Sequence, residues 1–124
     1  EPFKIVYFHQ PPYSPGPHGS ATNMQFPFSV WEADAVLAGH EHFYAHITDN
    51  NSPKPLYLII GNSGNENLYN CNANPLDPNR FTINYCDNSH FGAIQVTTTK
   101  TKMVFKYYTT DQPSYPKDIS IINK

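Results

Sequence analysis

The apolar runs of this sequence are short, and their length limits what the chain can fold into. Runs such as Leu56–Ile60 are separated by clusters of Pro, Gly, Asn and Ser, and no stretch sustains the period of an amphipathic helix. Short runs rich in β-branched and aromatic residues are typical of strands. We therefore predict a strand-dominated α/β (α+β) fold with one or two short helices.

The expected elements follow from these runs and from the turn residues between them. Residues 65–88 are dominated by Asn, Pro and Asp, which favour turns, so we expect a long surface loop there. We expect strands at 4–8, 34–38, 56–60 and 119–122, a hairpin formed by 92–98 and 102–109, and a short helix at 28–33.

Length and charge exclude several classes of protein. The 124 residues suffice for one modest core, so residues 1–124 are expected to form a single domain or part of one. A formal net charge of −2 provides no broad basic surface, and binding to a nucleic-acid backbone is not expected. The apolar runs are also far too short to span a bilayer.

Histidines stand at the ends of two of the predicted strands. His9 follows the run Val6-Tyr7-Phe8, and His40 and His42 follow a second run that ends at Gly39. Strand ends at the rim of a sheet are common places for ligands and metals, and neutral imidazole is a good ligand for transition metals. We predict that these three histidines converge at the carboxyl ends of two adjacent strands and bind metal.

The two cysteines and one glycosylation motif concern the cellular compartment. Cys71 and Cys86 flank a segment with little regular periodicity; a disulfide between them is favoured, and two reduced buried thiols are the alternative. Asn50 begins an Asn-x-Ser sequon, although Pro53 directly after the triplet disfavours its modification. Together these features favour a secreted or luminal protein.

The order of the histidine motifs resembles that of a known family. Three phrases carry the resemblance: His9-Gln10-Pro11-Pro12-Tyr13, His18-Gly19-Ser20 and Gly39-His40-Glu41-His42-Phe43-Tyr44. In this order they resemble the C-terminal half of a calcineurin-like metallophosphoesterase, in its purple-acid-phosphatase-like branch. The resemblance implies that the chain is the C-terminal half of a metallophosphoesterase β-sandwich.

The resemblance also implies a role for each motif residue. His9 and His40 would bind one ion of a dinuclear centre of Fe, Zn or Mn, and His42 would bind the other. A metal-bound hydroxide would then hydrolyse phosphate monoesters. His18 would bind the phosphoryl oxygens or protonate the leaving group, with a solvent-exposed loop histidine as the alternative. Tyr44 matches a family tyrosine beside the site and would contact substrate.

The sequence departs from the family in what it lacks. The first-half signatures Asp-x-His, Gly-Asp and Gly-Asn-His, which supply a bridging carboxylate and further ligands, have no counterpart here. Ala45-His46 replaces an acidic residue and an Arg, and His90 is interpreted as structural. Two interpretations stay open: part of a phosphoesterase completed by an N-terminal half or a complementary chain, or a non-catalytic secreted scaffold or assembly subunit. Both predict a polypeptide partner.

Overall fold

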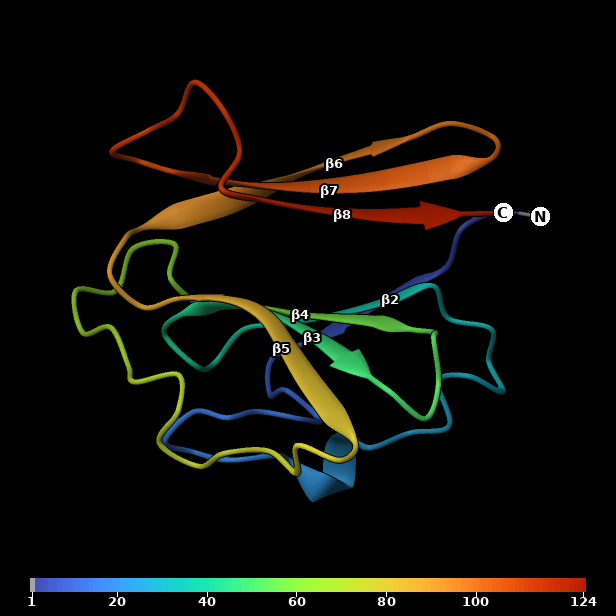
Figure 1. Ribbon diagram of the computed structural model, residues 1–124, viewed down its shortest axis with the longest axis horizontal. Coiled ribbons are helices and arrows are strands. Elements are labelled where there is room, and N and C mark those ends of the chain that lie inside the picture. Colours follow the sequence, from blue (N-terminus) through green and yellow to red (C-terminus); the bar gives the residue numbers. More distant parts are fainter. Residues whose placement is uncertain (1) are drawn as a thin grey trace.

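Two facing β-sheets form the molecule, as seen in the computed structural model, which describes residues 2–124 (Figure 1). The first sheet has the strand order β1-β2-β4-β3-β5, and the second has the order β6-β7-β8. The strands are β1 (Ile5–Phe8), β2 (Ala35–Ala38), β3 (Tyr44–Asp49), β4 (Leu56–Ile60), β5 (Phe81–Asp87), β6 (Gly92–Thr98), β7 (Lys102–Thr109) and β8 (Asp118–Asn123). The predicted strand-dominated sandwich is confirmed.

The first sheet is mixed, and its parallel part places the strand ends that matter below. β1 pairs parallel to β2 with Phe8 opposite Ala38, and β2 pairs parallel to β4. β3 runs antiparallel to both β4 and β5. The carboxyl ends of β1 and β2 therefore lie side by side at one edge of the sheet.

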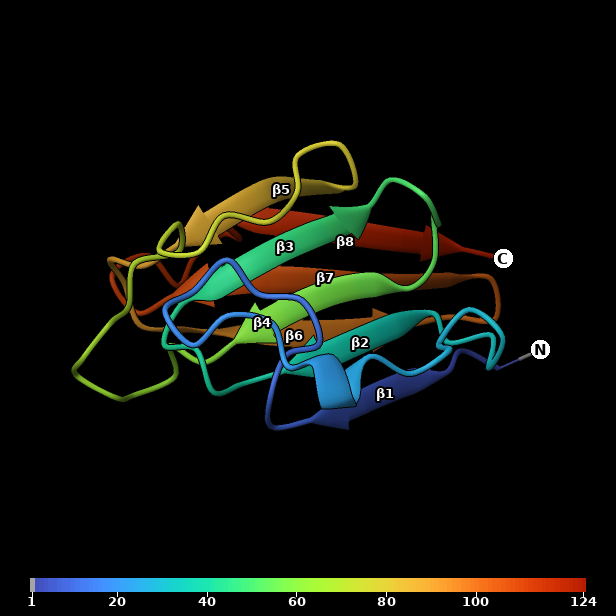
Figure 2. The same cartoon turned by 90° about the horizontal axis from the view of Figure 1, so that it is seen from below.

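The first sheet is buried on both faces, which explains its apolar central strands. One face packs on the second sheet through a cluster that includes Tyr44, Leu58 and Tyr107. The other face is covered by loops: Tyr13 and Tyr69 pack against a cluster built on the central strands. Figure 2 shows the segment after β1 crossing this face. A sheet covered on both sides needs the near-continuous apolar runs that made β2 and β4 predictable.

The prediction of one long surface loop at 65–88 was wrong, because β5 (Phe81–Asp87) lies inside it. β5 is an edge strand with an exposed middle, and it directly follows an Asn- and Pro-rich stretch, so the composition of 65–88 as a whole resembles that of a loop. It is a strand because its backbone pairs with β3, from Phe81 opposite Asp49 to Asp87 opposite Tyr44. Such long-range pairing leaves little trace in local composition.

The short helix predicted at 28–33 is also wrong. The chain forms overlapping turns there, with the Trp31 amide donating to Pro27 at 3.1 Å and the Ala33 amide donating to Phe28 at 3.0 Å. Glu32 has a φ of 56°, in the left-handed region, which interrupts a right-handed helical path. Within residues 2–124 the one helical element is a 3₁₀ turn, η1 (Thr22–Met24).

Candidate functional site

His9 and His40 meet at the carboxyl edge of β1 and β2. His9 is the first residue after β1, and the Gly39 amide donates to its carbonyl oxygen at 3.0 Å. The next residue, His40, has a φ of 65°, and this left-handed conformation turns the chain at the rim of the sheet. The Nδ1 atom of His40 then lies 3.1 Å from the Nε2 atom of His9.

His18 reaches the same place from the loop that follows β1. This loop makes a tight turn in which the Gly19 amide donates to Gly16 at 3.0 Å, and Gly19 takes a φ of 69°. The centroid of the His40 ring lies 4.4 Å from that of the His18 ring and 4.9 Å from that of the His9 ring. A small pocket opens beside His18 and His40. Three imidazoles thus form one continuous group at the rim.

Glu41, the residue between His40 and His42, supports this group through contacts with His18. Its side chain is 0% exposed. One carboxylate oxygen, Oε1, accepts the His18 amide at 2.9 Å and the Ser14 hydroxyl at 3.2 Å, and the other, Oε2, lies 3.2 Å from His18 Nδ1. The sequence offered a signal for it, since Glu41 is the one acidic residue between the paired histidines.

His42 packs against Asn67 and Tyr69, two residues that the sequence motifs do not identify and that form a wall beside the rim. Its ring stacks on Tyr69 with centroids 4.1 Å apart and planes 16° apart, and its Nδ1 atom lies 2.7 Å from the carbonyl oxygen of Asn67. The Tyr69 amide in turn donates to the His42 carbonyl at 3.0 Å. No local pattern identifies Asn67 or Tyr69, because their role depends on a contact with a distant turn.

A disulfide holds this wall in place. Cys71, two residues beyond Tyr69, is bonded to Cys86 of β5, with an S–S distance of 2.04 Å and a Cα–Cα distance of 6.6 Å. The predicted pairing of the two cysteines is confirmed. The staple joins the segment that packs on His42 to the edge of the first sheet.

The environment of His40 changes the pKa of its ring. Desolvation, together with repulsion from the imidazoles of His18 and His9, lowers the pKa of His40 below its ordinary value. The lower pKa favours the neutral ring near physiological pH. Neutral imidazole is the form that can offer a lone pair to a metal.

Two other predicted residues lie elsewhere. Tyr44 is 1% exposed, and its hydroxyl donates to Asp118 at 2.7 Å in the space between the sheets, so this placement does not support contact with substrate at the rim. Burial, with the hydrogen bond to Asp118, raises the pKa of Tyr44 far above its usual range. Asn50 is exposed in the turn after β3, where its side chain accepts from Thr82 at 3.1 Å; its glycosylation stays a prediction.

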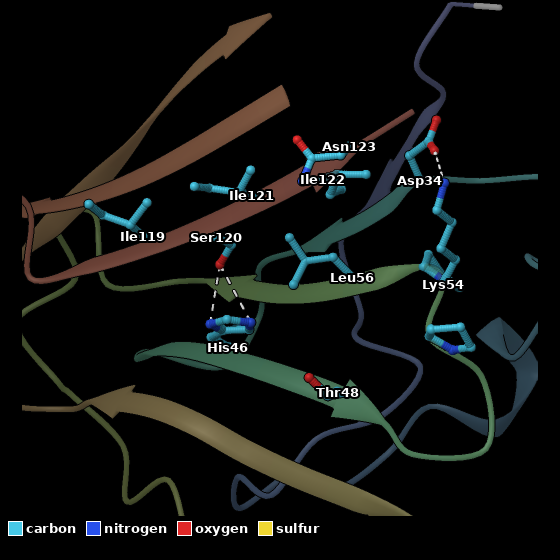
Figure 3. Close-up of a pocket in the computed structure, with 12 residues that line it drawn as sticks. Asp34, His46, Thr48, Lys54, Leu56, Ile119, Ser120, Ile121, Ile122 and Asn123 are labelled. Atoms are coloured by element: carbon cyan, nitrogen blue, oxygen red, sulfur yellow. Dashed lines mark hydrogen bonds and ion pairs between the residues drawn. The ribbon is translucent and has the colours of Figure 1, made fainter. Parts of the chain in front are cut away.

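A second pocket lies between the sheets. Figure 3 shows it between β3, β4 and β8, with Ser120 of β8 and His46 of β3 in contact with one another in its lining. The Ser120 hydroxyl lies 3.2 Å from His46 Nδ1, and Asp118 lies 3.1 Å from the same atom. His46 is thus held by two partners from β8.

The rim histidines fit part of a metal centre. Two imidazole nitrogens bound side by side to one ion lie about 3.0–3.4 Å apart for typical metal–nitrogen bond lengths of about 2.1 Å. The 3.1 Å between His9 and His40 matches this separation. However, residues 2–124 hold no group of three or more His, Cys, Asp or Glu side chains arranged to bind a metal. The residues present therefore fit one side of a single ion and do not by themselves fit a dinuclear centre.

Comparison of this chain with solved structures identifies the type of fold. The chain has a purple-acid-phosphatase-like fold, so the predicted resemblance is confirmed for the fold. The purple acid phosphatase PPD1 of yellow lupin superposes with a TM-score of 0.78 at 17% identity over 98% of this chain. GAP50, the anchor in the inner membrane complex of Plasmodium, superposes with a TM-score of 0.76 at 18% identity over 98% of this chain.

The extent of these similarities is partial. The chain spans 25% of the lupin enzyme chain and 36% of the GAP50 chain. No family model matches the sequence, and no curated protein matches it. Within residues 2–124, no helix has the length and apolar character needed to cross a membrane.

Proposed function

We propose that this chain supplies the histidine face of a dinuclear-metal phosphoesterase site that hydrolyses phosphate monoesters. The observation that carries the proposal is the contact of His9 and His40, 3.1 Å apart at the shared carboxyl edge of two parallel strands. In the proposal both bind one ion and His42 binds the second. The purple-acid-phosphatase-like fold supports this chemistry, and the ions would be Fe, Zn or Mn.

His18 is the proposed substrate-facing residue. Its ring lies beside His40 at the mouth of the small rim pocket, and 46% of its side chain is exposed. An imidazole in this position can bind a phosphoryl oxygen or exchange a proton with the leaving group. When bound, the metal pair would supply the electrophilic stabilisation of the phosphoryl group.

The missing ligands would come from a second polypeptide segment. Within the part of the chain that the structure describes, the rim offers imidazoles, and the acidic side chain beside them, Glu41, is turned inward onto the loop. β1 is an open edge of the first sheet, and Tyr7 on it is 80% exposed. An added strand could pair with this edge and carry an acidic group to the rim. Residues 1–124 are accordingly proposed to be one part of a domain.

The disulfide supports a secreted or luminal location for the protein. Disulfides persist in oxidising compartments and are rare in the cytosol. Cys71 and Cys86 are both used in the bond, and residues 2–124 contain no other cysteine. A glycan on Asn50 would be consistent with the same compartment.

A non-catalytic scaffold or assembly subunit is the second candidate. It is favoured by the absence, in residues 2–124, of a group of three metal-binding side chains, and by the internal partners that occupy Glu41 and His42. One protein with this fold is itself described as an anchor. In this alternative the rim histidines serve packing or a lone metal.

Reconstitution separates the two candidates. The chain alone, with Zn²⁺, Mn²⁺ or Fe supplied, should release no phosphate from p-nitrophenyl phosphate at an enzymatic rate. Mixing or joining it with a segment that carries Asp-x-His, Gly-Asp and Gly-Asn-His should restore turnover, and His42→Ala should remove most of it, with His46→Ala as the matched histidine control. Metal-dependent turnover by the chain alone would overturn the half-site assignment. A complex that neither binds metal nor turns over would favour the scaffold.

A further inference from the structure

A buried carboxylate stands directly behind the exposed ring of His18. Glu41 is 0% exposed, whereas 46% of the His18 side chain is exposed. We infer that Glu41 is a positioning residue that fixes the orientation and the tautomer of His18, so that Nε2 is the ring atom presented to substrate. This inference rests on the proposed function for its chemical meaning, but its geometry does not depend on bound metal.

Glu41 holds both the backbone and the ring of His18. Oε1 accepts the His18 amide at 2.9 Å, and Oε2 lies 3.2 Å from its Nδ1 atom. Ser14 adds a third contact: its hydroxyl donates to Oε1 at 3.2 Å and accepts from the Gly16 amide at 3.0 Å. The loop from Ser14 to His18 is thereby closed around one side chain.

Two glycines show how closely the surroundings fit Glu41. A Cβ atom on Gly16 would lie 2.4 Å from Cδ of Glu41, and a Cβ on Gly61 would lie 1.9 Å from its backbone oxygen. Neither distance is compatible with a side chain larger than hydrogen unless the structure shifts. The carboxylate therefore has little room to adopt another rotamer, and its direction toward His18 is fixed by packing.

The acceptor character of the carboxylate selects the tautomer. In neutral imidazole one ring nitrogen carries hydrogen and the other carries a lone pair, and the partner determines which. An ionised carboxylate can only accept, so Nδ1 of His18 must donate to Oε2 of Glu41. Nε2 then carries the lone pair on the exposed side of the ring, where it can accept a proton and later return it.

Replacement of Glu41 by glutamine should reverse the tautomer of His18. In Glu41→Gln, the amide oxygen must occupy the Oε1 position, because the His18 amide and the Ser14 hydroxyl both point there. The NH₂ group then takes the Oε2 position and donates to Nδ1 of His18. The ring is forced into the opposite tautomer, with hydrogen on Nε2, while the contacts of the Oε1 position with the His18 amide and the Ser14 hydroxyl are kept.

The test is the ring-nitrogen NMR spectrum of the ¹⁵N-labelled chain, recorded about 1.5 pH units above the ordinary histidine pKa of about 6.5. Wild-type His18 should show a protonated Nδ1 and an unprotonated Nε2, and Glu41→Gln should exchange the two signals. Ser14→Ala is the matched control, because it removes a donor from Oε1 and leaves the Nδ1 contact intact. Its His18 signals should match those of the wild type.

Each outcome decides the matter. A wild-type His18 with hydrogen on Nε2, or an unchanged tautomer in Glu41→Gln, would overturn the inference. If Glu41→Gln fails to fold, the wild-type spectrum alone decides. The spectrum requires neither metal nor turnover, so the positioning role can hold even if the chain proves to be a scaffold, and it can fail while the phosphoesterase function stands.

Discussion

The six histidines divide between two regions of the molecule that use the same side chain differently. At the rim, His9 and His40 contact each other, and among residues 2–124 no carboxylate is hydrogen-bonded to or paired with either ring. Away from the rim, His46 lies 3.1 Å from Asp118 and His90 lies 3.0 Å from Asp87. A histidine paired with a carboxylate is held in one orientation by it, and at the rim this applies to His18, which contacts Glu41. His9 and His40 instead orient each other.

The carboxylates that pair with these two histidines join the two sheets. His46 lies on β3 and its partner Asp118 on β8, and the same carboxylate accepts the Tyr44 hydroxyl at 2.7 Å. Asp87 at the end of β5 accepts the hydroxyl of Tyr107 of β7 at 3.0 Å. The contacts of Asp118 with His46 and Tyr44, and of Asp87 with Tyr107, cross the sandwich, whereas His90 contacts Asp87 three residues before it in the chain.

The largest expected effect on stability concerns the wall of the rim. Replacing both Cys71 and Cys86 by Ser should destabilise the fold by about 3 kcal/mol, because the cross-link restricts the unfolded chain. The double substitution should also weaken the stacking of Tyr69 on His42, because Cys71 lies two residues after Tyr69. Urea denaturation measures the first effect, and a change in the His42 ring signal with unchanged His46 signals would show that the loosening is confined to the rim.

The next effect concerns Asp118 of β8, which contacts Tyr44 and His46 of β3. Asp118→Asn should cost about 2 kcal/mol, because Tyr44 and His46 lose a charged acceptor. Asp111→Asn is the matched control: this carboxylate is half exposed, and its replacement should cost less than about 1 kcal/mol. Equal losses in the two variants would contradict the view that the buried pair joins the sheets.

The pH dependence of the same variant gives a second check. Burial alone would raise the pKa of Asp118, but hydrogen bonds from His46 and Tyr44 outweigh it, and the pKa is lowered overall. The carboxylate therefore stabilises the fold above its unfolded pKa of about 4, and this contribution is lost as the pH falls through the lower folded pKa. The stability difference between wild type and Asp118→Asn should shrink below about pH 4 in denaturation curves.

A smaller effect is expected beneath His18. Gly16→Ala should destabilise the fold by about 1–2 kcal/mol, because the added methyl group would meet the carboxylate of Glu41 at 2.4–2.6 Å. Gly64→Ala is the control, since nothing lies within 4 Å of a Cβ atom there. Thermal unfolding of the two variants measures the difference. A Gly16→Ala protein as stable as Gly64→Ala would show that the loop is looser around Glu41 than its contacts indicate.

The part of the account that could be predicted from the sequence is the part encoded locally. β2 and β4 are buried on both faces, so their apolar runs identified them, and the histidines at the strand ends followed. The family resemblance alone predicts Tyr44 beside the site. Because side chains alternate along β3, Tyr44 faces the second sheet while its neighbours Phe43 and Ala45 face the loops.

The rest depends on contacts between distant segments. The edge strand β5 is defined by its pairing with β3, and Asn67 and Tyr69 contact His42 from a loop 25 or more residues further along the chain. The packing that turns Glu41 toward His18 requires glycines at two separate positions of the chain. Single-sequence patterns do not report such long-range contacts.

The most direct test of the central claim is a titration of the chain with Co²⁺, followed through the ring signals of all six histidines. Co²⁺ is paramagnetic and broadens the signals of the groups that bind it, so even weak occupancy is detected. We expect His9 and His40 to broaden first, His46 and His90 to stay sharp, and His9→Ala to abolish the selective broadening. Equal broadening of all six histidines, or selective broadening that persists in His9→Ala, would contradict the assignment of the rim as a half-site for metal.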